Sequence, residues 1–561
     1  MDQRWKIKII DDLKSEKLAN DLGVKNIISR LLVSRDVLTY SEAERFFRPK
    51  ISDLHDPYLM KGMGEAVNRI DLALKRKEKI LIYGDYDVDG TTSVAMMYSF
   101  LKRFTENIGY YIPDRYKEGY GVSFTAIDYA QLNEYSLIIT LDCGIRAIRQ
   151  VEYASNKGID FIICDHHQPG VNLPMAISIL NPKQDQCVYP YKELSGCGVG
   201  FKLIQAFANK KNINFTEIAE YMDLLSVSIG ADIVDMNGEN RVFAFYGLRI
   251  INSAPRAGLK ALIKNSNNKG HMSMSDVVFK IAPRINAAGR IEHGSKAVRL
   301  LIEEDFDKAL MIAAQIENYN FQRRQLDTKI TEEAIKMIDR NKMSTVVFSD
   351  GWHKGVIGIV ASRLIEHEYK PTIVLCQDNE YLTGSARSVK GFDLYSALLD
   401  CEHLLERFGG HKYAAGLTLK KENLNLFITE FEKIVADRIT SDQLQSEIEI
   451  DIEIDISQVT DKIYRIIKQF ETFGPKNRKP IFVTRVIKEF VDAKLVGSDQ
   501  NHLKLVLRSD DKKISCIGFG MQNEYKQILN ATSFDICYSI DENKWNNNTE
   551  LQLRLKGVKA F

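Results

Sequence analysis

Three aspartates stand at every second position of the segment GDYDVDG, residues 84–90: Asp85, Asp87 and Asp89. Carboxylates this close repel one another unless water or a cation neutralises them, and a divalent cation is the usual way to hold them together. The spacing therefore predicts a metal site. The alternative is a solvated acidic turn, and this segment alone does not decide between the two.

Two later strand-like segments end in the same way. The first leads into Asp142 and a glycine, and the second leads into Asp165, His166 and His167. Adjacent side chains of an extended chain point in opposite directions, so we expect one histidine to bind metal. The other should either face the substrate or receive a hydrogen bond outside the ligand shell.

The elements that must position these side chains are buried strands. Short apolar runs such as residues 80–83 alternate with helical segments from residue 79 onward, which is typical of a parallel α/β sheet. Ligands of open α/β sheets bind beyond the carboxyl ends of the strands, so the three strand ends should converge on one site. Asp232, which follows another apolar stretch at 224–229, is our candidate for the last ligand.

Composition excludes some classes of protein. The 561 residues require several domains, and 76 Lys and Arg nearly balance 75 Asp and Glu, so a nucleic-acid partner must be held by local clusters rather than by a uniformly basic surface. The eight cysteines form no CxxC pair and are typical of buried thiols in a reducing compartment. The sequence has no signal core and no apolar run of membrane-spanning length, so we expect a cytoplasmic protein without a membrane partner.

Several motifs resemble those of a known superfamily in their order. GDYDVDG (84–90), PDR (113–115), DCG (142–144), DHH (165–167) and ADIVD (231–235) resemble the motifs of the DHH phosphoesterases. The segments IAPRINAAGR (281–290), WHKGVIGIVASRL (352–364), GSARS (384–388) and GGHKYAAG (409–416) resemble the RecJ branch. The resemblance implies an exonuclease that hydrolyses single-stranded DNA from the 5′ end to 5′-mononucleotides in DNA repair and recombination, with single-strand-binding protein and a RecQ-type helicase as partners. The alternatives are a phosphodiesterase of short oligonucleotides or dinucleotides, and a non-catalytic replication scaffold.

The resemblance also implies a catalytic centre with two divalent ions. The positions that match its ligands are Asp87, Asp89, Asp142, His166 and Asp232, and we expect Asp85 to join the ligands and His167 to join the catalytic group. Mixed carboxylate and imidazole ligands favour Mn²⁺, with Mg²⁺ as a substitute. Tyr83 departs from the pattern, because many members carry a histidine there. A phenol is a poor ligand at neutral pH, so we expect one ion to be bound by fewer protein groups and more water.

Substrate-binding positions follow from the same resemblance. We expect them at Arg115, Arg284, Asn286, Arg290, His353, Ser385, Arg387 and His411, with Arg284 and Arg290 flanking a turn at 286–289. Arginine suits bidentate phosphate contacts, and a glycine-bearing turn at Gly358 enters a helix whose amides could face an anion. A pocket for a 5′ phosphate would place the first diester over the metal ions. The alternative for the glycine-rich segment 409–416 is a turn that only allows close packing.

We predict an α/β protein of five parts. They are an N-terminal helical segment (1–75), a parallel-sheet DHH domain (76–300), a long connecting helix (301–343), a smaller α/β domain of the DHHA1 type (344–440) and a C-terminal β-barrel of the OB-fold type (441–561). The long helical pattern, residues 306–341, fits either a connector or a coiled-coil dimerisation helix.

The C-terminal part shows strand periodicity. Strict alternation at 447–456 predicts one strand with an acidic face, and later alternating runs at 481–486, 503–508, 514–519 and 551–556 predict the rest of the barrel. OB surfaces bind single strands through cationic grooves and stacking, so we assign strand binding to this barrel; a structural or protein-binding module is the alternative. In its basic loop at 473–482, Lys476 stands where glycine is frequent in the family.

Overall fold

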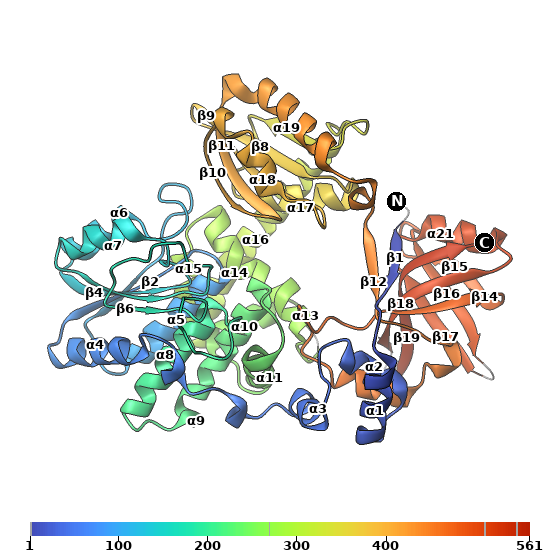
Figure 1. Ribbon diagram of the computed structural model, residues 1–561, viewed down its shortest axis with the longest axis horizontal. Coiled ribbons are helices and arrows are strands. Elements are labelled where there is room, and N and C mark those ends of the chain that lie inside the picture. The colour runs from blue at the N-terminus through green and yellow to red at the C-terminus, as the bar shows by residue number, and fades with distance from the viewer. Residues whose placement is uncertain (1–2, 269, 510–511, 546–547) are drawn as a thin grey trace. The chain divides into compact units, whose positions relative to one another are not determined.

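The computed structural model describes residues 3–268, 270–509, 512–545 and 548–561. The chain folds into two compact units (Figure 1). The larger unit comprises residues 6–289, 293–314 and 449–561, and the smaller unit comprises residues 3–5, 290–292 and 315–448. The predicted α/β class is confirmed. Among the described helices, none has the length and apolar character to cross a membrane.

A parallel five-stranded sheet organises the larger unit. Its order is β3 (Ile108–Tyr111), β2 (Lys79–Gly84), β4 (Tyr135–Leu141), β5 (Asp160–Cys164) and β6 (Ser178–Leu180). Leu81 and Tyr83 share a core with α6 (Phe124–Leu132) and α7 (Ile148–Ser155) on one face. The helices α4 (Met63–Lys75), α5 (Val88–Lys102) and α8 (Gly196–Lys210) also contact the sheet, and the alternate residues Ile80 and Ile82 point to their side. The sheet is therefore covered on both faces.

A group of helices completes this half of the larger unit. They are α9 (Phe215–Ile218), α10 (Met222–Asp232), α11 (Gly238–Ser253), α12 (Ala257–Asn265), α13 (Met274–Asp276), a π-helical turn (Val277–Ile281), α14 (Ala282–Ile291) and α15 (Ser295–Ile302). Helix α10 is apolar on all sides and buried from Met222 to Gly230, as expected for a helix inside the core. It ends at Asp232, which it presents at the edge of the core.

The smaller unit contains a second, mixed sheet. Its order is β10 (Leu405–His411), β11 (Ala414–Lys420), β9 (Tyr381–Arg387), β8 (Thr372–Asp378) and β7 (Thr345–Ser349), with only β7 and β8 parallel. The helices of this part are α17 (Ile357–His367), α18 (Leu394–Leu399) and α19 (Leu424–Arg438). Phe427 and Phe431 of α19 pack in its core with the sheet residues Ile373 and Leu417.

The long helix α16 is shorter than its sequence pattern suggested. It runs without a break from Phe306 to Ile335, about 45 Å at 1.5 Å per residue, and ends six residues before the expected end at 341. Residues 336–337 and 340–341 form turns instead, and residues 338–339 are irregular. The preceding residues 295–302 form the separate helix α15.

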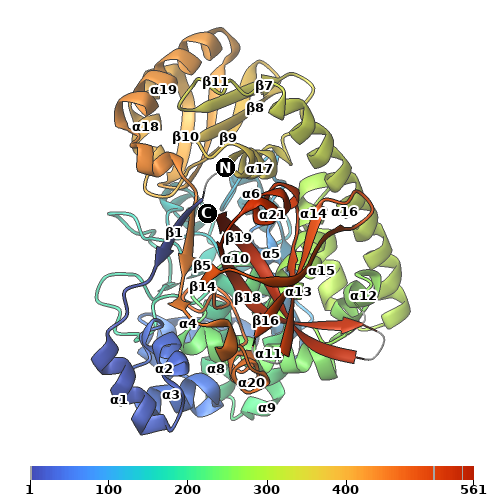
Figure 2. The same cartoon turned by 90° about the vertical axis from the view of Figure 1, so that its right-hand side faces the viewer.

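The C-terminal sheet has the strand order β13 (Ile452–Glu453), β14 (Phe482–Ile487), β18 (Phe534–Trp545), β19 (Asn548–Ala560), β17 (Lys512–Gly518), β16 (His502–Ser509) and β15 (Phe490–Val496), and Figure 2 shows several of these strands. Strands β17 and β19 pair in parallel. The consecutive strands β14 and β15 have different partners, because β14 pairs with β18 and β15 pairs with β16. This is the connectivity of an OB barrel, as predicted. Helices α20 (Asp461–Lys468) and α21 (Gln522–Asn530) accompany it.

The predicted single strand at 447–456 is wrong. The chain forms β12 (Glu447–Ile450) and β13, with a break at Asp451. Asp451 is only 3% exposed. Its carboxylate points inward, where it accepts hydrogen bonds from the Ile481 amide (2.9 Å) and from Lys8 Nζ (2.8 Å). One member of the expected acidic face is therefore buried and paired.

The N-terminal segment packs with this barrel. It consists of β1 (Arg4–Ile7), which pairs with β12, and the helices α1 (Asp12–Leu22), α2 (Asn26–Val33) and α3 (Tyr40–Phe47). Leu31 and Leu32 of α2 lie in the same hydrophobic core as Ile463 of α20 and Phe482 of β14.

Candidate active site

The ends of two neighbouring strands deliver the first acidic side chains. Strand β2 ends at Gly84, and Asp87 then caps α5 by accepting a hydrogen bond from the Gly90 amide at 2.9 Å. Strand β4 leads into Asp142, whose φ of 60° lies in the left-handed region. A non-glycine residue in that region is strained, and such strain persists where the surrounding structure fixes a functional side chain.

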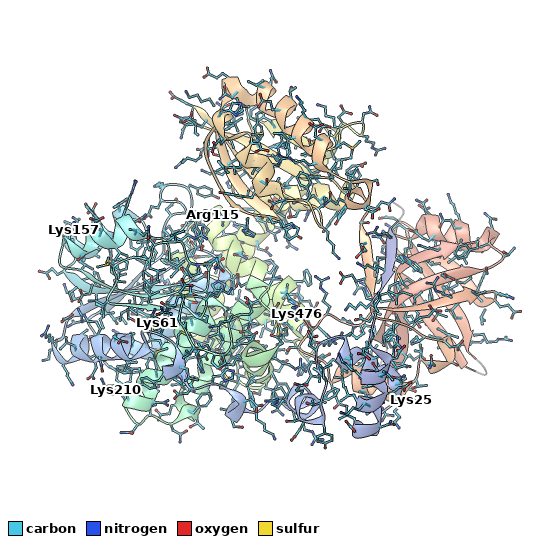
Figure 3. All side chains as sticks on the ribbon, in the orientation of Figure 1. Lys25, Lys61, Arg115, Lys157, Lys210 and Lys476 are labelled. Atoms are coloured by element: carbon cyan, nitrogen blue, oxygen red, sulfur yellow. The ribbon has the colours of Figure 1, made fainter. Side chains whose placement is uncertain are left out.

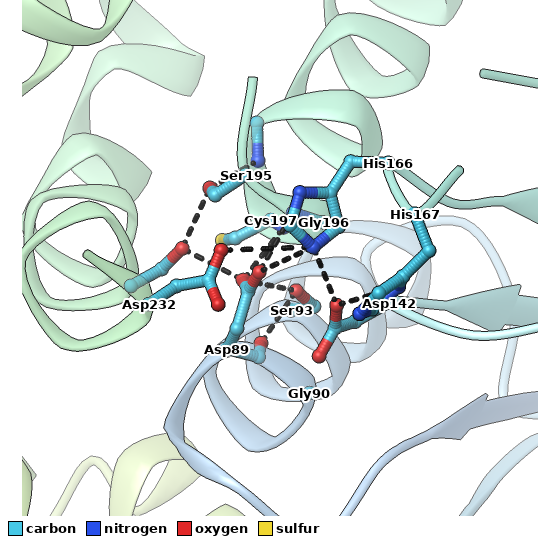
Figure 4. Close-up of polar contacts among 12 residues, drawn as sticks. Asp89, Gly90, Ser93, Asp142, His166, His167, Ser195, Gly196, Cys197 and Asp232 are labelled. Carbon is cyan, nitrogen blue, oxygen red and sulfur yellow. Dashed lines mark hydrogen bonds and ion pairs between the residues drawn. The ribbon is translucent and has the colours of Figure 1, made fainter. Parts of the chain in front are cut away.

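Asp89 is held by hydrogen bonds from other elements (Figure 4). The Gly196 and Cys197 amides at the start of α8 donate to it at 2.7 and 2.9 Å, and Ser228 Oγ of α10 donates at 2.7 Å. A Cβ atom on Gly196 would lie 2.5 Å from Cβ of Asp142, so only glycine lets α8 approach this closely. The helix terminus therefore fixes Asp89 and packs against Asp142.

The His166 ring lies at the centre of the acidic side chains. Its Nε2 atom is 3.1 Å from Asp142 Oδ1, 3.6 Å from Asp232 Oδ2 and 3.8 Å from Asp89 Oδ2 (Figure 4). The buried atoms His166 Nε2, Asp142 Oδ1 and Asp232 Oδ2 nevertheless make no hydrogen bond in the described part of the chain, and the same holds for Asp85 Oδ1. Buried polar atoms without partners are costly, so four of them in one place indicate a site for a cation.

Electrostatics support this interpretation. Burial raises the pKa of Asp142 well above its usual range, and the charges of Asp89 and Asp87 raise it further. Burial and the same two carboxylates also raise the pKa of Asp232. Burial lowers the pKa of His166, which favours the neutral ring that metals require. A bound cation would instead lower the pKa of these carboxyl groups and keep them ionised.

Three groups of side chains have ligand atoms close enough to share an ion. They are Asp89, His166 and Asp232; Asp85, Asp87 and Asp142; and Asp142, His166 and His167. The ligand atoms within each group all lie within 4.8 Å of one another. The residues thus fit divalent cations in both chemistry and spacing, and every predicted ligand belongs to at least one group.

His167 differs from its neighbour. Its Nδ1 lies 2.8 Å from Asp165 Oδ1, and the hydroxyl of Tyr120 lies 3.1 Å from its Nε2. Burial opposes protonation of His167, but the hydrogen bond and charge of Asp165 raise its pKa. The ring is therefore oriented by protein groups on both nitrogens, which suits a role beside the ligands.

Sequence reasoning missed Asp165 as a positioning residue. Besides His167, the carboxylate accepts hydrogen bonds from the amides of Ile145 (2.9 Å) and His166 (2.8 Å). Burial alone would raise its pKa, but the hydrogen bond and charge of the His167 ring and the hydrogen bonds from the Ile145 and His167 amides lower the pKa of Asp165 to about 2. Its place directly before two histidines at a strand end was the available signal. The sequence held no such signal for Ser228 or for the start of α8.

Tyr83 is a core residue. Its side chain is 1% exposed, its hydroxyl donates to the Gly121 carbonyl at 2.6 Å, and its ring stacks on Tyr111. Burial raises its pKa well above the usual value, so the hydroxyl stays protonated. At this position the chain supplies packing rather than a ligand.

One of the predicted cationic positions, Arg115, lies near the acidic cluster. Its guanidinium, labelled in Figure 3, stacks 4.4 Å from the centre of the Tyr86 ring. Burial raises the pKa of Asp85, whereas the positive charge of Arg115 lowers the pKa of this carboxyl group. Helix α14 also approaches Tyr86, because a Cβ atom on Gly289 would lie 2.7 Å from the Tyr86 carbonyl oxygen.

The predicted turn at 286–289 is wrong, because these residues lie inside α14. Arg284, Asn286 and Arg290 are therefore helical residues. Within the smaller unit, Arg290 Nη1 donates to the Gly355 carbonyl at 2.9 Å. Arg290 thus contacts the loop that leads into α17 rather than flanking a turn.

In the smaller unit, Ser385 and Arg387 lie at the start of α17. A Cβ atom on Gly358 would be 3.0 Å from Ser385 Oγ and 3.2 Å from Arg387 Nη2. Arg387 Nη1 donates to Ser385 Oγ and to the Ala386 carbonyl, and among the described residues it forms no ion pair with a carboxylate. Burial lowers its pKa. A guanidinium and a helix start without a counter-ion fit an anion.

The predicted residues His353 and His411 belong to the same unit as Ser385 and Arg387. His353 Nδ1 accepts a hydrogen bond from the Gly355 amide at 3.0 Å, on the loop that enters α17. Across the sheet, His411 faces Ala414, and Ala414 faces Arg387. Directly opposed residues share a face of a sheet, so His411 and Arg387 lie on the same face. Gly409, Gly416 and Ser385 occupy the next row of that face and leave it flat.

Comparison with protein families gives three matches. The DHH family N-terminal domain matches residues 79–229, the DHHA1 domain matches residues 341–437 and the RecJ OB domain matches residues 450–557.

Several known proteins are similar to this chain over most of its length. The single-stranded-DNA-specific exonuclease RecJ of Bacillus subtilis is 38% identical over 99% of this chain and 70% of its own length. The Escherichia coli protein of that name is 29% identical over 95% of each chain. Among solved structures, RecJ from Thermus thermophilus in complex with Mn²⁺ has a TM-score of 0.86 at 24% identity, covering 99% of this chain and 79% of that one. An exonuclease RecJ bound to manganese has a TM-score of 0.62 at 31% identity, covering 70% of this chain and 97% of that one.

Proposed function

Because the chain belongs to the RecJ family of single-stranded-DNA-specific exonucleases, we propose that it is a metal-dependent nuclease that hydrolyses single-stranded DNA. The observation that carries the proposal is the convergence of Asp85, Asp87, Asp89, Asp142, His166 and Asp232 on one buried place. Degradation from the 5′ end, release of 5′-mononucleotides and a role in DNA repair and recombination belong to the same proposal.

Two ions fit the arrangement of donors. The group of Asp89, His166 and Asp232 shares no residue with the group of Asp85, Asp87 and Asp142. We assign one ion to each group. The imidazole in the first group favours Mn²⁺, while the all-carboxylate second group suits Mn²⁺ or Mg²⁺.

The cations supply the activation of water and the neutralisation of charge that phosphodiester hydrolysis requires. The protein contributes position and proton control. Asp165 holds Nδ1 of His167, so that Nε2 of this ring is directed away from Asp165 and toward Tyr120. We assign His167 to hold or deliver the proton of the leaving 3′ oxygen, and Arg115 to bind a neighbouring phosphate.

End selection is assigned to the smaller unit. Ser385, Arg387 and the start of α17 would bind a terminal 5′ phosphate, with His353 and His411 at its border. Capture of the terminus would fix which diester is presented for hydrolysis, and this gives exonuclease rather than endonuclease action. Arg284, Asn286 and Arg290 are proposed to contact the strand from α14.

The remaining assignments rest on the family and on composition. We keep the boundaries 76–300, 344–440 and 441–561 for the DHH, DHHA1-type and OB domains, with 1–75 and 301–343 as N-terminal segment and connector. The barrel is proposed to bind single-stranded DNA. Single-strand-binding protein and a RecQ-type helicase are proposed partners, and the cytoplasm is the proposed location because all eight thiols are free.

The test compares the parent protein with Asp142→Ala on single strands labelled at the 5′ or 3′ end, with Mn²⁺. The parent should release labelled mononucleotides early from the 5′ label and late from the 3′ label, and Asp142→Ala should be inactive. The matched control is Asp235→Ala, because Asp235 is an acidic residue outside the three donor groups. Unchanged activity of Asp142→Ala would exclude this site from the reaction.

A further inference from the structure

The candidate metal ligand Asp232 is placed by its backbone rather than by its side chain. It is the last residue of α10, and its Oδ2 atom accepts no hydrogen bond from any residue that the structure describes. Asp89, in the same donor group, has three such donors. The position of the Asp232 carboxylate therefore depends on how the chain continues after α10.

The residue that follows Asp232 has a strained backbone. Ile233 has a φ of 61°, in the left-handed region, and it is 67% exposed. A β-branched residue keeps this conformation only where the surrounding structure imposes it. Because Ile233 itself is mostly exposed, contacts of the residues after it must maintain the strain.

The next residues are held from two directions. The Tyr191 hydroxyl donates to Oδ1 of Asn237 at 2.8 Å. The Met236 amide donates to the Pro475 carbonyl at 2.9 Å, Met236 is 1% exposed, and a Cβ atom on Gly474 would lie 3.1 Å from its side chain. Pro475 and Gly474 are far away in sequence, so this second contact is a tertiary one.

Both residues belong to a loop of the C-terminal barrel domain. This brace loop, residues 469–477, lies between α20 and β14, inside the part of the chain that matches the RecJ OB domain. The segment that follows the candidate ligand thus packs against a domain that supplies no member of the three donor groups.

A buried arginine of α11 holds the brace loop. Arg241 is 4% exposed, and among the described residues it forms no ion pair with a carboxylate. One donation, at 2.8 Å, goes to the Phe46 carbonyl of the N-terminal segment. At 3.1–3.5 Å its guanidinium donates to four consecutive carbonyls of the loop, those of Gln469, Phe470, Glu471 and Thr472.

Asn477 joins these carbonyls to the other end of the loop. It is 1% exposed, and its Nδ2 atom donates to the carbonyls of Phe470 at 2.8 Å and Thr472 at 2.7 Å. Its Oδ1 atom accepts a hydrogen bond from Arg35 Nε at 3.0 Å. The carbonyls that Arg241 binds are therefore fixed relative to Pro475, and loss of Arg241 would loosen the whole loop.

We propose that the brace loop positions the metal ligand Asp232, and that Arg241 is the positioning residue that holds the loop. The loop binds Met236, this contact keeps Ile233 in its left-handed conformation, and that conformation directs Asp232 toward the other ligands of its ion. The barrel domain then contributes to the catalytic centre in addition to binding the strand. This inference rests on the proposed function, because it concerns one of the two proposed ions.

Calorimetric titration with Mn²⁺ in the absence of DNA tests the proposal. Arg241→Gln should weaken one of the two binding steps about 10- to 100-fold, the range for loss of a group that orients a metal ligand, and leave the other step unchanged. The weakened step should be the one that Asp232→Asn also weakens. In a protein that already carries Asp232→Asn, adding Arg241→Gln should have no further effect, because one residue acts through the other. Additive effects would refute the proposal.

Two further variants separate positioning from a general loss of stability. Ile233→Gly removes the left-handed strain, because glycine adopts this conformation freely, so adding it to Arg241→Gln should restore most of the Mn²⁺ affinity. Arg69→Gln is the matched control: it removes an arginine of the same unit that pairs with Glu78 at 2.6 Å and with Asp160 at 2.7 Å. It should lower Tm and leave both Mn²⁺ steps unchanged.

Activity on single-stranded DNA gives a second measurement. A high Mn²⁺ concentration should restore the kcat of Arg241→Gln, while KM for the strand stays at the parent value. A raised KM that Mn²⁺ does not restore would show that the brace loop acts on the strand alone, and would refute the positioning role. If Arg241→Gln fails to fold, Arg241→Lys, which keeps the charge but has fewer donors, should show the same effects at smaller size.

The outcomes distinguish the two proposals. If the parent degrades single strands but Arg241→Gln and Arg241→Lys bind Mn²⁺ as tightly as the parent in both steps, the positioning role is refuted and the proposed function stands. If the parent binds no Mn²⁺ or degrades no strand, the proposed function itself fails.

Discussion

Replacement of Asp142 by asparagine should have opposite effects on stability without and with metal. Asp142 belongs to two of the three donor groups, and its Oδ1 atom has no hydrogen bond to any residue that the structure describes. The charges of Asp89 and Asp87 oppose its own. Asparagine has the same shape and removes one of the crowded negative charges. In EDTA, Asp142→Asn should therefore be at least as resistant to heat as the parent.

Mn²⁺ should then distinguish the two proteins. An ion at 100 times its Kd adds about 2.7 kcal/mol to the free energy of unfolding of a one-site protein. For a domain of 150–250 residues this raises Tm by roughly 5–10 °C, since 1 kcal/mol corresponds to about 2–4 °C. If the substitution weakens the site of the ion held by Asp85, Asp87 and Asp142 about 100-fold, the same concentration lies near Kd. The gain from that ion then falls to about 0.4 kcal/mol, or about 1 °C, while the ion held by Asp89, His166 and Asp232 keeps its own contribution.

The assay is thermal unfolding followed by intrinsic fluorescence, in EDTA and over a series of Mn²⁺ concentrations. Asp235→Asn is the control, because it makes the same chemical change on the segment after α10 but outside the donor groups. It should retain the full shift. A full Mn²⁺ shift in Asp142→Asn, or a clear loss of stability in EDTA, would refute the argument that unpaired carboxylates meet at this point to hold a cation.

Four other substitutions test separate parts of the structure. Asp165→Asn should lower kcat about 10- to 100-fold, because His167 loses its charged partner, while most of the Mn²⁺ shift in Tm remains; an unchanged kcat would contradict the positioning role. Arg387→Gln should erase a preference for 5′-phosphorylated over 5′-hydroxyl strands by raising KM about 10- to 100-fold for the former alone, and equal effects on both ends would oppose the anion pocket. Lys476→Gly should raise the free energy of unfolding in urea by about 0.5–1 kcal/mol, because φ is 60° at this lysine and the left-handed strain exceeds the entropic cost of glycine. A lower free energy of unfolding would show that the lysine side chain makes a stabilising contact. Tyr83→Phe should lower the free energy of unfolding by about 0.5–1.5 kcal/mol, because the hydrogen bond is lost, and should not change the affinity for Mn²⁺. A lower affinity for Mn²⁺ would show that Tyr83 contributes to the metal site.

The parallel sheet was predictable because its signals are local. Each buried strand is an apolar run that ends at a polar residue, and parallel strands necessarily bring such ends to one edge. Asp87, Asp142 and His166 could therefore be grouped from the sequence alone, and the structure brings them together. The OB barrel was predictable for a similar reason, since alternation along one strand shows which face is buried.

The errors have equally local causes. The segment 447–456 alternates strictly, but Asp451 turns inward because the Ile481 amide and Lys8 lie there, and both partners are distant in sequence. The glycine in the segment around 286–289 suggested a turn, yet the residue lies within α14, where its lack of a side chain allows the helix to reach Tyr86. In each case a tertiary contact decided the local conformation, and no periodicity within the segment records such a contact.

The hydrogen bonds around the candidate site show which of its groups the fold itself holds in place. Asp89 has donors from α8 and α10, and Asp165 has donors from three backbone amides, so these carboxylates are satisfied by the fold itself. The atoms of Asp142, His166 and Asp232 that lack a hydrogen-bond partner in the described part of the chain are held in place by strand and helix ends, whose positions the satisfied groups fix. Metal binding therefore requires little rearrangement, and its free energy offsets a repulsion that the fold has built in. A site of this kind should bind cations with a small change in structure and a large change in stability.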